Sequence, residues 1–78
     1  TLDMKKAGRG RLLYGADGPV RVFLNGQPVD CQSGASNPIY PDHYQPRVQW
    51  EKGTNTVVFA LDTNHGRAWG VTARGVMD

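Results

Sequence analysis

The chain has 78 residues, of which 38% are apolar and 21% charged, so it is neither long enough for two domains nor polar enough to be disordered. It holds no apolar run of the ~20 residues that cross a bilayer as a helix, so we expect no membrane-spanning helix and no membrane partner. The net charge of +2 is spread along the chain except for the basic opening MKKAGRGR, and this does not favour nucleic acid. We expect one domain, residues 1–78.

The N-terminus and the cysteine content add two expectations. The chain begins at Thr1 without Met or an apolar leader, which suggests a mature or excised segment of a larger protein. Cys31 is the single cysteine, so no internal disulfide and no thiolate zinc site is expected. Since neither histidine is adjacent to it, Cys31 is predicted to be an unreactive, partly buried thiol.

The first half of the chain reads as β-strands separated by turns. RLLY (residues 11–14) is followed by the turn cluster GADGP and then by VRVFL (residues 20–24), a pattern that predicts a hairpin. Asn25-Gly26 follows, and both residues tolerate positive φ. A second hairpin is therefore predicted, closed by a short strand through Val29.

A long connection interrupts this pattern between residues 31 and 46. It contains Ser, Gly and Asn together with three prolines, Pro38, Pro41 and Pro46, which break any regular element. Loops of this length are often functional or cross between two sheets.

Alternation returns in RVQW (residues 47–50), TVVFAL (56–61) and RAWGVTAR (67–74). In the last of these Gly70, Thr72 and Arg74 face one way and Trp69, Val71 and Ala73 the other, so Trp69 falls in the core row. Five to six antiparallel strands with regular turns indicate a β-sandwich or a partly open barrel. The alternation predicts a largely buried set of Val22, Leu24, Val48, Trp50, Val57, Phe59, Leu61 and Val71.

Three motifs in this order carry a resemblance to a known family. GADGPVRVFLNGQPV, NPIYPD and EKGTNTVVFALDTNHGRAWGVTAR resemble the later strands of the galactose-binding-like jelly-roll domains attached to glycoside hydrolases and other polysaccharide-active enzymes. The resemblance implies an all-β fold, a small antiparallel β-sandwich of jelly-roll type. Such domains have about eight strands and are longer, so the early strands are expected to be missing and sheet edges to be open.

The resemblance also implies a function. It points to a non-catalytic carbohydrate-binding or accessory module of a polysaccharide-active enzyme, in a secreted or periplasmic location. Its partners would be carbohydrate and either the catalytic domain of the parent enzyme or a second copy. The alternative is a structural interaction module that pairs an open sheet edge with a partner and binds no sugar.

Sugar binding requires an aromatic face for the C–H surface of the ring and polar side chains for its hydroxyl groups. Two loops supply such groups and are predicted to meet at one end of the sandwich. Turn formation by Asp62 and Asn64, and packing of Arg67 over a buried Trp69, are the alternatives. The candidate residues are Asn37, Tyr40, Asp42 and Tyr44 in the long connection, and Asp62, Asn64, Arg67 and Trp69 in the later loop.

No catalytic constellation is visible in the sequence, because the seven acids lie mostly at turns and no Ser-His-Asp set or phosphate-binding loop occurs. DTNHG (residues 62–66) resembles the start of a calcium loop, but the twelfth position is Ala73 rather than Glu and the flanks read as strands. We therefore expect no enzyme activity and no cofactor, with a structural calcium ion as the remaining alternative.

Overall fold

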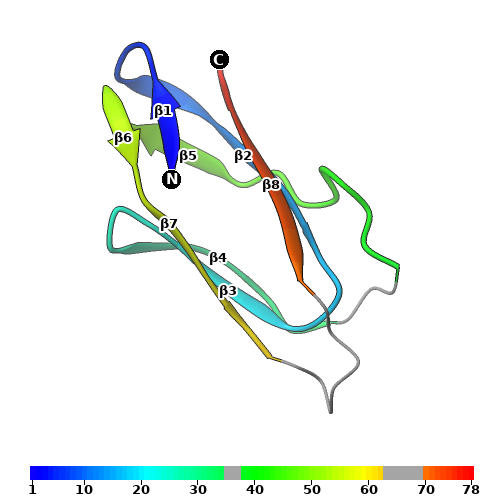
Figure 1. Ribbon diagram of the computed structural model, residues 1–78. Helices are drawn as coiled ribbons and strands as arrows, with labels where there is room; N and C mark the ends of the chain where they lie inside the picture. Colours follow the sequence, from blue (N-terminus) through cyan, green and yellow to red (C-terminus); the bar gives the residue numbers. More distant parts are fainter. Residues whose placement is uncertain (35–37, 63–69) are drawn as a thin grey trace.

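The structure, a computed structural model, describes residues 1–34, 38–62 and 70–78. These residues form eight β-strands and no helix, so none of them belongs to a helix that could cross a membrane (Figure 1). The strands are β1 (Leu2–Met4), β2 (Gly8–Ala16), β3 (Val20–Leu24), β4 (Gln27–Gln32), β5 (Arg47–Trp50), β6 (Gly53–Asn55), β7 (Val57–Leu61) and β8 (Val71–Met77).

The strands pair into two three-stranded antiparallel sheets, ordered β5-β2-β8 and β4-β3-β7, and a small β1-β6 pair. The two larger sheets lie face to face (Figure 1), with β2 and β3 as their central strands. This arrangement confirms the predicted fold class, an all-β, small antiparallel sandwich. Two short strands, β1 and β6, were not expected from the sequence.

The core lies between the two sheets and consists mainly of alternate residues of the central strands. Of the eight residues predicted to be buried, Val22, Leu24, Val48 and Trp50 are, whereas the other four pack against the core and are only half-buried. These four lie on the edge strands β7 and β8, but the edge position alone is not the cause, since Val48 and Trp50 are buried on the edge strand β5. The half-buried residues are Val57, Phe59, Leu61 and Val71.

The predicted hairpin between residues 11–14 and 20–24 is wrong. β2 and β3 are consecutive, but they belong to opposite sheets and their inward side chains face each other across the core. The strands that flank the later loop, β7 and β8, are divided between the sheets in the same way. Alternation identifies which face of a strand is buried, but it does not distinguish pairing within a sheet from packing between sheets.

The predicted hairpin at Asn25-Gly26 is confirmed. Both residues have positive φ, 49° and 81°, as a two-residue turn between twisted strands requires. The β3–β4 pairing then shifts by one residue between Val22 and Phe23. Because of this bulge, Val22 lies opposite Asp30 rather than Val29.

The bulge also decides the position of the cysteine. With Asp30 on the inner side of β4, its neighbour Cys31 lies on the outer side and is exposed, so the prediction of a partly buried thiol is wrong. The Tyr14 hydroxyl donates a hydrogen bond to Asp30 Oδ2 at 2.5 Å. Burial, followed by this contact with a carboxylate, raises the pKa of the Tyr14 hydroxyl far above its ordinary value.

One buried polar side chain holds β1, β6 and the Asn25 turn together. Asn55 is fully buried, and its Oδ1 accepts hydrogen bonds from Asn25 Nδ2 and from the Glu51 backbone N–H, both at 2.9 Å. Its Nδ2 donates to the carbonyl groups of Glu51, Gly53 and Leu2 at 2.9, 3.2 and 3.4 Å. A buried amide is stable only when such partners are present.

The largest side chain of the core, Trp50, lies flat against two glycines. Its Nε1 donates a hydrogen bond to the Val76 carbonyl oxygen at 3.0 Å. A Cβ atom on Gly10 would lie 2.7 Å from Trp50 Nε1, and one on Gly75 would lie 2.7 Å from Trp50 Cζ2. Neither position accommodates a side chain while the indole remains in place.

We expect Gly10→Ala to lower the free energy of unfolding by about 3 kcal/mol, because the methyl group overlaps the indole and the Val76 carbonyl oxygen. Gly34→Ala is the control, since no atom lies within 4 Å of a Cβ at that position. Urea denaturation of both variants measures the difference. Equal stability of Gly10→Ala and the unsubstituted protein would contradict this role of Trp50.

We expect Asn55→Ala to cost about 2 to 3 kcal/mol, because it leaves buried backbone groups without partners. Thr54→Ala, an exposed substitution on the same strand that removes one hydrogen bond to Asp3, should change stability by less than about 1 kcal/mol. Thermal unfolding followed by circular dichroism compares the two. A loss no larger in Asn55→Ala than in Thr54→Ala would show that Asn55 does not hold these elements together.

Candidate functional site

Residues 38–46, here called the crossover segment, run alongside β2 and continue the line of β5. Tyr14 and Tyr44 exchange both backbone hydrogen bonds at 2.9 Å, and the Leu12 N–H donates to the Pro46 carbonyl oxygen at 3.0 Å. The prolines lack an N–H group, which limits this pairing to a few positions. The segment is thereby attached to the central strand of its sheet without forming a strand of its own.

The first part of the crossover segment passes over the outer face of β2. Gly15 lies against it there, because a Cβ at this position would overlap the Tyr40 carbonyl oxygen and lie 3.1 Å from Ile39 Cγ2. Leu13, which also faces outward, is buried. The chain then turns at Asp42, whose φ is 60°. The loop side chains are therefore positioned above a rigid sheet.

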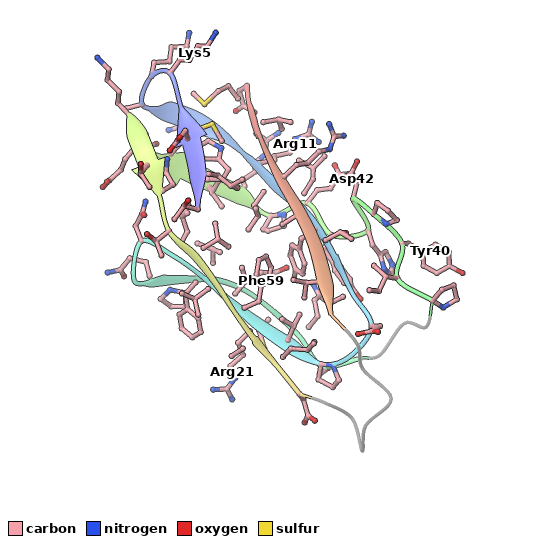
Figure 2. The ribbon with its side chains drawn as sticks, in the orientation of Figure 1. Lys5, Arg11, Arg21, Tyr40, Asp42 and Phe59 are labelled. Carbon is pink, nitrogen blue, oxygen red and sulfur yellow. The ribbon has the colours of Figure 1, made fainter. Side chains whose placement is uncertain are left out.

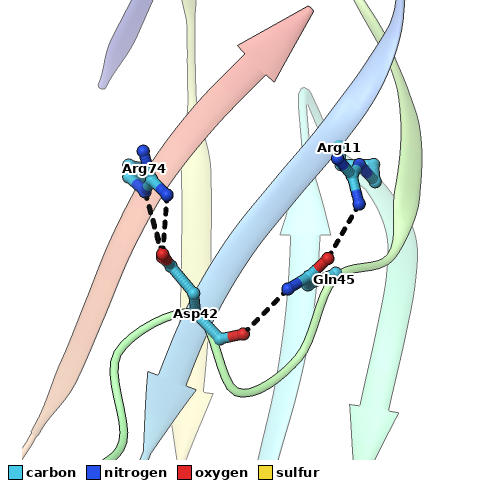
Figure 3. A network of polar contacts seen from close by, with 4 residues as sticks. All are labelled: Arg11, Asp42, Gln45 and Arg74. Atoms are coloured by element: carbon cyan, nitrogen blue, oxygen red, sulfur yellow. Dashed lines mark hydrogen bonds and ion pairs between the residues drawn. The ribbon is translucent and has the colours of Figure 1, made fainter. Parts of the chain in front are cut away.

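A network of polar contacts joins this segment to β2 and β8 (Figure 3). Asp42 accepts hydrogen bonds from Arg74 Nε at 3.0 and 3.1 Å and from Arg74 Nη2 at 2.7 Å. Gln45 Nε2 donates to the Asp42 carbonyl oxygen at 3.2 Å, and Arg11 Nη1 donates to Gln45 Oε1 at 2.8 Å. Since Arg74 lies opposite Leu13, its side chain crosses β2 to reach Asp42.

The contact between Arg74 and Asp42 keeps both side chains charged. Its hydrogen bonds hold the pKa of the Asp42 carboxyl below the ordinary value, and Asp42 in turn raises the pKa of Arg74. Both groups are therefore ionised at neutral pH. Asp42 acts as a fixed hydrogen-bond acceptor and not as a proton donor.

Four rings form a row from the surface into the core. Tyr40 is 56% exposed and lies edge-on to His43, with ring centroids 5.9 Å apart. His43 stacks on Tyr44 at 4.2 Å, and Tyr44 contacts the buried ring of Tyr14 at 5.1 Å. Tyr40 lies at the outer end of this row (Figure 2), where more than half of the residue is accessible to solvent.

The structure thus brings together three of the predicted site residues, Tyr40, Asp42 and Tyr44, within one segment. Asp62 is exposed at the end of β7, and its N–H donates to the Pro19 carbonyl oxygen at 2.8 Å. The other four predicted residues lie outside the described residues. They are Asn37, Asn64, Arg67 and Trp69.

The ends of the later loop are both attached to the connection between β2 and β3. Asp62 contacts Pro19, and the Gly70 N–H donates to Asp17 Oδ1 at 3.1 Å. Tyr40 lies against Gly15, close to the same connection. The described flanks of the two predicted loops are therefore at the same end of the sandwich.

Sequence reasoning missed three residues of the network, Arg11, Gln45 and Arg74. Arg74 was placed on the outward-facing row of its strand, but nothing in the pattern indicated a partner 32 residues away. The one available signal was chemical: an outward-facing arginine on a strand and an aspartate in a proline-bounded loop form a favourable pair.

Within residues 1–34, 38–62 and 70–78, no group of three or more His, Cys, Asp or Glu side chains is placed to hold a metal ion. The start of the calcium-like motif is Asp62, and the rest of that motif lies outside these ranges. No family model, curated protein or solved structure matches the chain. The resemblance to galactose-binding-like domains therefore stays a prediction.

We expect Arg74→Gln to return the pKa of Asp42 toward its ordinary value. Because the folded-state pKa is lowered, the pair stabilises the fold above the ordinary carboxyl pKa, and this contribution is lost as the pH falls through the lowered pKa. Carboxyl chemical shifts recorded over an acidic pH series measure both values. Arg47→Gln, which removes a different exposed ion pair, should leave Asp42 unchanged; a similar shift in both variants would contradict the assignment.

Proposed function

We propose that the protein is a non-catalytic carbohydrate-binding or accessory module of a polysaccharide-active enzyme, and that the crossover segment forms its sugar-binding surface. The observation that carries this proposal is the exposed Tyr40 ring, which lies in the same segment as Asp42 and Gln45. An accessible ring face suits the C–H surface of a pyranose, and fixed polar groups beside it suit its hydroxyl groups.

The chemistry of the polar groups supports binding rather than catalysis. Asp42 is kept ionised by Arg74, so it accepts hydrogen bonds and does not protonate a glycosidic oxygen. A single exposed ring with a few polar neighbours corresponds to millimolar to micromolar affinity, about 4 to 8 kcal/mol. Accessory modules that act beside a catalytic domain work in this range because the two are linked.

The later loop belongs to the same proposal. Its flanks, Asp62 and Gly70, are attached at the end of the sandwich where Tyr40 lies. We propose that its polar and aromatic residues extend the sugar-binding surface, together with one residue that precedes the crossover segment. The residues concerned are Asn64, Arg67 and Trp69 in the loop, and Asn37 before the segment.

A second candidate function rests on the opposite face of the molecule. Val58 is 51% exposed on the outer side of β7, next to the outward-facing Phe23 of β3. β7 is also an edge strand of its described sheet. An apolar strand with an open edge favours docking to another domain or a second copy, which is the structural-module alternative.

Substitution of Tyr40 tests the first candidate. We expect Tyr40→Ala to weaken the binding of neutral oligosaccharides by about tenfold without lowering stability, because the ring contacts solvent rather than the core. A glycan array selects the sugar, and amide chemical-shift titration measures the affinity. Val58→Ala is the matched control on the opposite face.

The two candidates give different results. If Tyr40→Ala binds as the unsubstituted protein does, the crossover segment is not the sugar-binding surface. If no sugar shifts any amide, while Val58→Ala abolishes a concentration-dependent association seen by sedimentation, the structural module is the better account.

A further inference from the structure

A group of arginines covers the outer face of the β5-β2-β8 sheet. Arg9 and Arg11 alternate with buried residues on β2, Arg47 lies on the neighbouring edge strand, and Arg74 lies on β8. Arg11 lies on the side of the molecule opposite to Arg21, the outward-facing arginine of β3 (Figure 2). The basic residues that look dispersed in the sequence are thus partly gathered on one face by the fold.

The acidic groups on this face neutralise only half of these charges. Arg74 is paired with Asp42, and Arg47 Nη1 lies 3.2 Å from Asp78 Oδ2, with the Arg47 side chain 76% exposed. Among the described residues, Arg9 and Arg11 have no ion pair, and the ten residues outside those ranges include no Asp or Glu. Positive charge therefore remains uncompensated on β2.

The register places two of these like charges directly opposite each other. Arg11 and Arg47 are cross-strand partners, and Arg9 is two residues from Arg11 on the same face. Like charges at directly opposed positions of an antiparallel pair are destabilising. The Arg11 guanidinium contacts a neutral amide, Gln45, which does not offset this repulsion. An anion bound between these side chains would offset the repulsion.

A shallow hollow of about 460 Å³ lies beside Arg9 and Arg47, and Arg11 borders this face without lining the hollow. Its volume is within the range of small-molecule sites. Arg9, Arg47 and Gln49 contribute side chains that donate hydrogen bonds, and Asp78 closes one side. Guanidinium groups bind carboxylate and sulfate oxygens in paired hydrogen bonds, and an amide serves neighbouring hydroxyl groups.

We propose that Arg9, Arg11 and Arg47, here called the arginine face, bind the acidic groups of an anionic polysaccharide. The polysaccharide class rests on the proposed function, whereas the anion specificity rests on the charges described above. The shared chemistry is an oxyanion, a carboxylate or a sulfate, on a hydroxyl-rich chain. The arginine face and the crossover segment are contiguous through Arg11 and Gln45, so one chain can contact both.

Nucleic acid fits this face less well. Asp42 and Asp78 lie at its borders, each paired with an arginine, so the unpaired positive charge is confined to Arg9 and Arg11. The outward residues that the structure describes on β5, β2 and β8 include no aromatic side chain on which a base could stack. A polysaccharide with hydroxyl groups between its charges matches the alternation of Arg, Gln and Asp.

The test compares the unsubstituted protein with the double variant Arg9→Gln, Arg47→Gln. The probes are polygalacturonate for carboxylate, dextran sulfate for sulfate, neutral dextran and single-stranded oligothymidine, each titrated by calorimetry or chemical shift. The control variant, Arg21→Gln with Lys52→Gln, removes the same charge from exposed positions outside the arginine face. Near-ultraviolet circular dichroism confirms that both variants are folded.

We expect at least one acidic polysaccharide to bind more tightly than neutral dextran, and to lose about tenfold or more in affinity in the double variant. The control should lose less than about threefold, as screened long-range attraction predicts. The preferred acidic polymer then identifies the oxyanion. Equal losses in both variants would overturn the proposal, and so would oligothymidine binding as tightly as the acidic polysaccharides.

The two proposals fail in different ways. If neutral oligosaccharides bind through Tyr40 but acidic polymers bind no more tightly, the proposal for the arginine face is wrong and the proposal for the sugar-binding surface is retained. If neither neutral nor acidic carbohydrate binds, the proposed function fails and the polysaccharide assignment fails with it.

Discussion

The contact between Trp50 and the two glycines Gly10 and Gly75 determines most of what lies on the outer face of its sheet. The indole spans the inner side of β2 and bonds to β8, so it fixes the register of three strands at once. Residues adjacent to each glycine point outward because strand side chains alternate. Arg9 and Arg11 flank Gly10, and Arg74 precedes Gly75. An apolar contact in the core thus sets the positions of the surface arginines.

The strand pattern of this chain was largely readable from its sequence, whereas the pairing of the strands was not, apart from the β3–β4 hairpin. RVQW and VRVFL show the alternation of half-buried strands, and Asn25-Gly26 has the chemistry of a two-residue turn. The glycine-containing parts of β2 and β8 were overlooked because glycine is ordinarily depleted in strands. Here Gly10 and Gly75 make room for Trp50, a requirement that appears only once the partner is known.

The candidate site was predictable in composition and not in geometry. The prolines between residues 38 and 46 and the Tyr, Asp and His side chains among them marked a segment capable of polar recognition. Its attachment to Arg74 and Arg11 depends on contacts between residues more than 30 positions apart. The inward position of Asp30 depends on a bulge of one residue, and the sequence pattern of β4 does not predict this bulge.

The division of consecutive strands between different sheets has a consequence for how the chain reaches its fold. Among the described strands, β3 and β4 are the only sequence neighbours that pair; β1 must find residues 53–55 and β2 must find residues 71–77. Each such pairing loses the entropy of closing a long loop before any contact between the strands stabilises it. The chain therefore belongs with the high-contact-order β-proteins, which fold in about milliseconds to seconds. We expect the Asn25-Gly26 hairpin, the local pairing among the described strands, to form early, and stopped-flow refolding of a Gly26 variant would show whether its formation limits the rate.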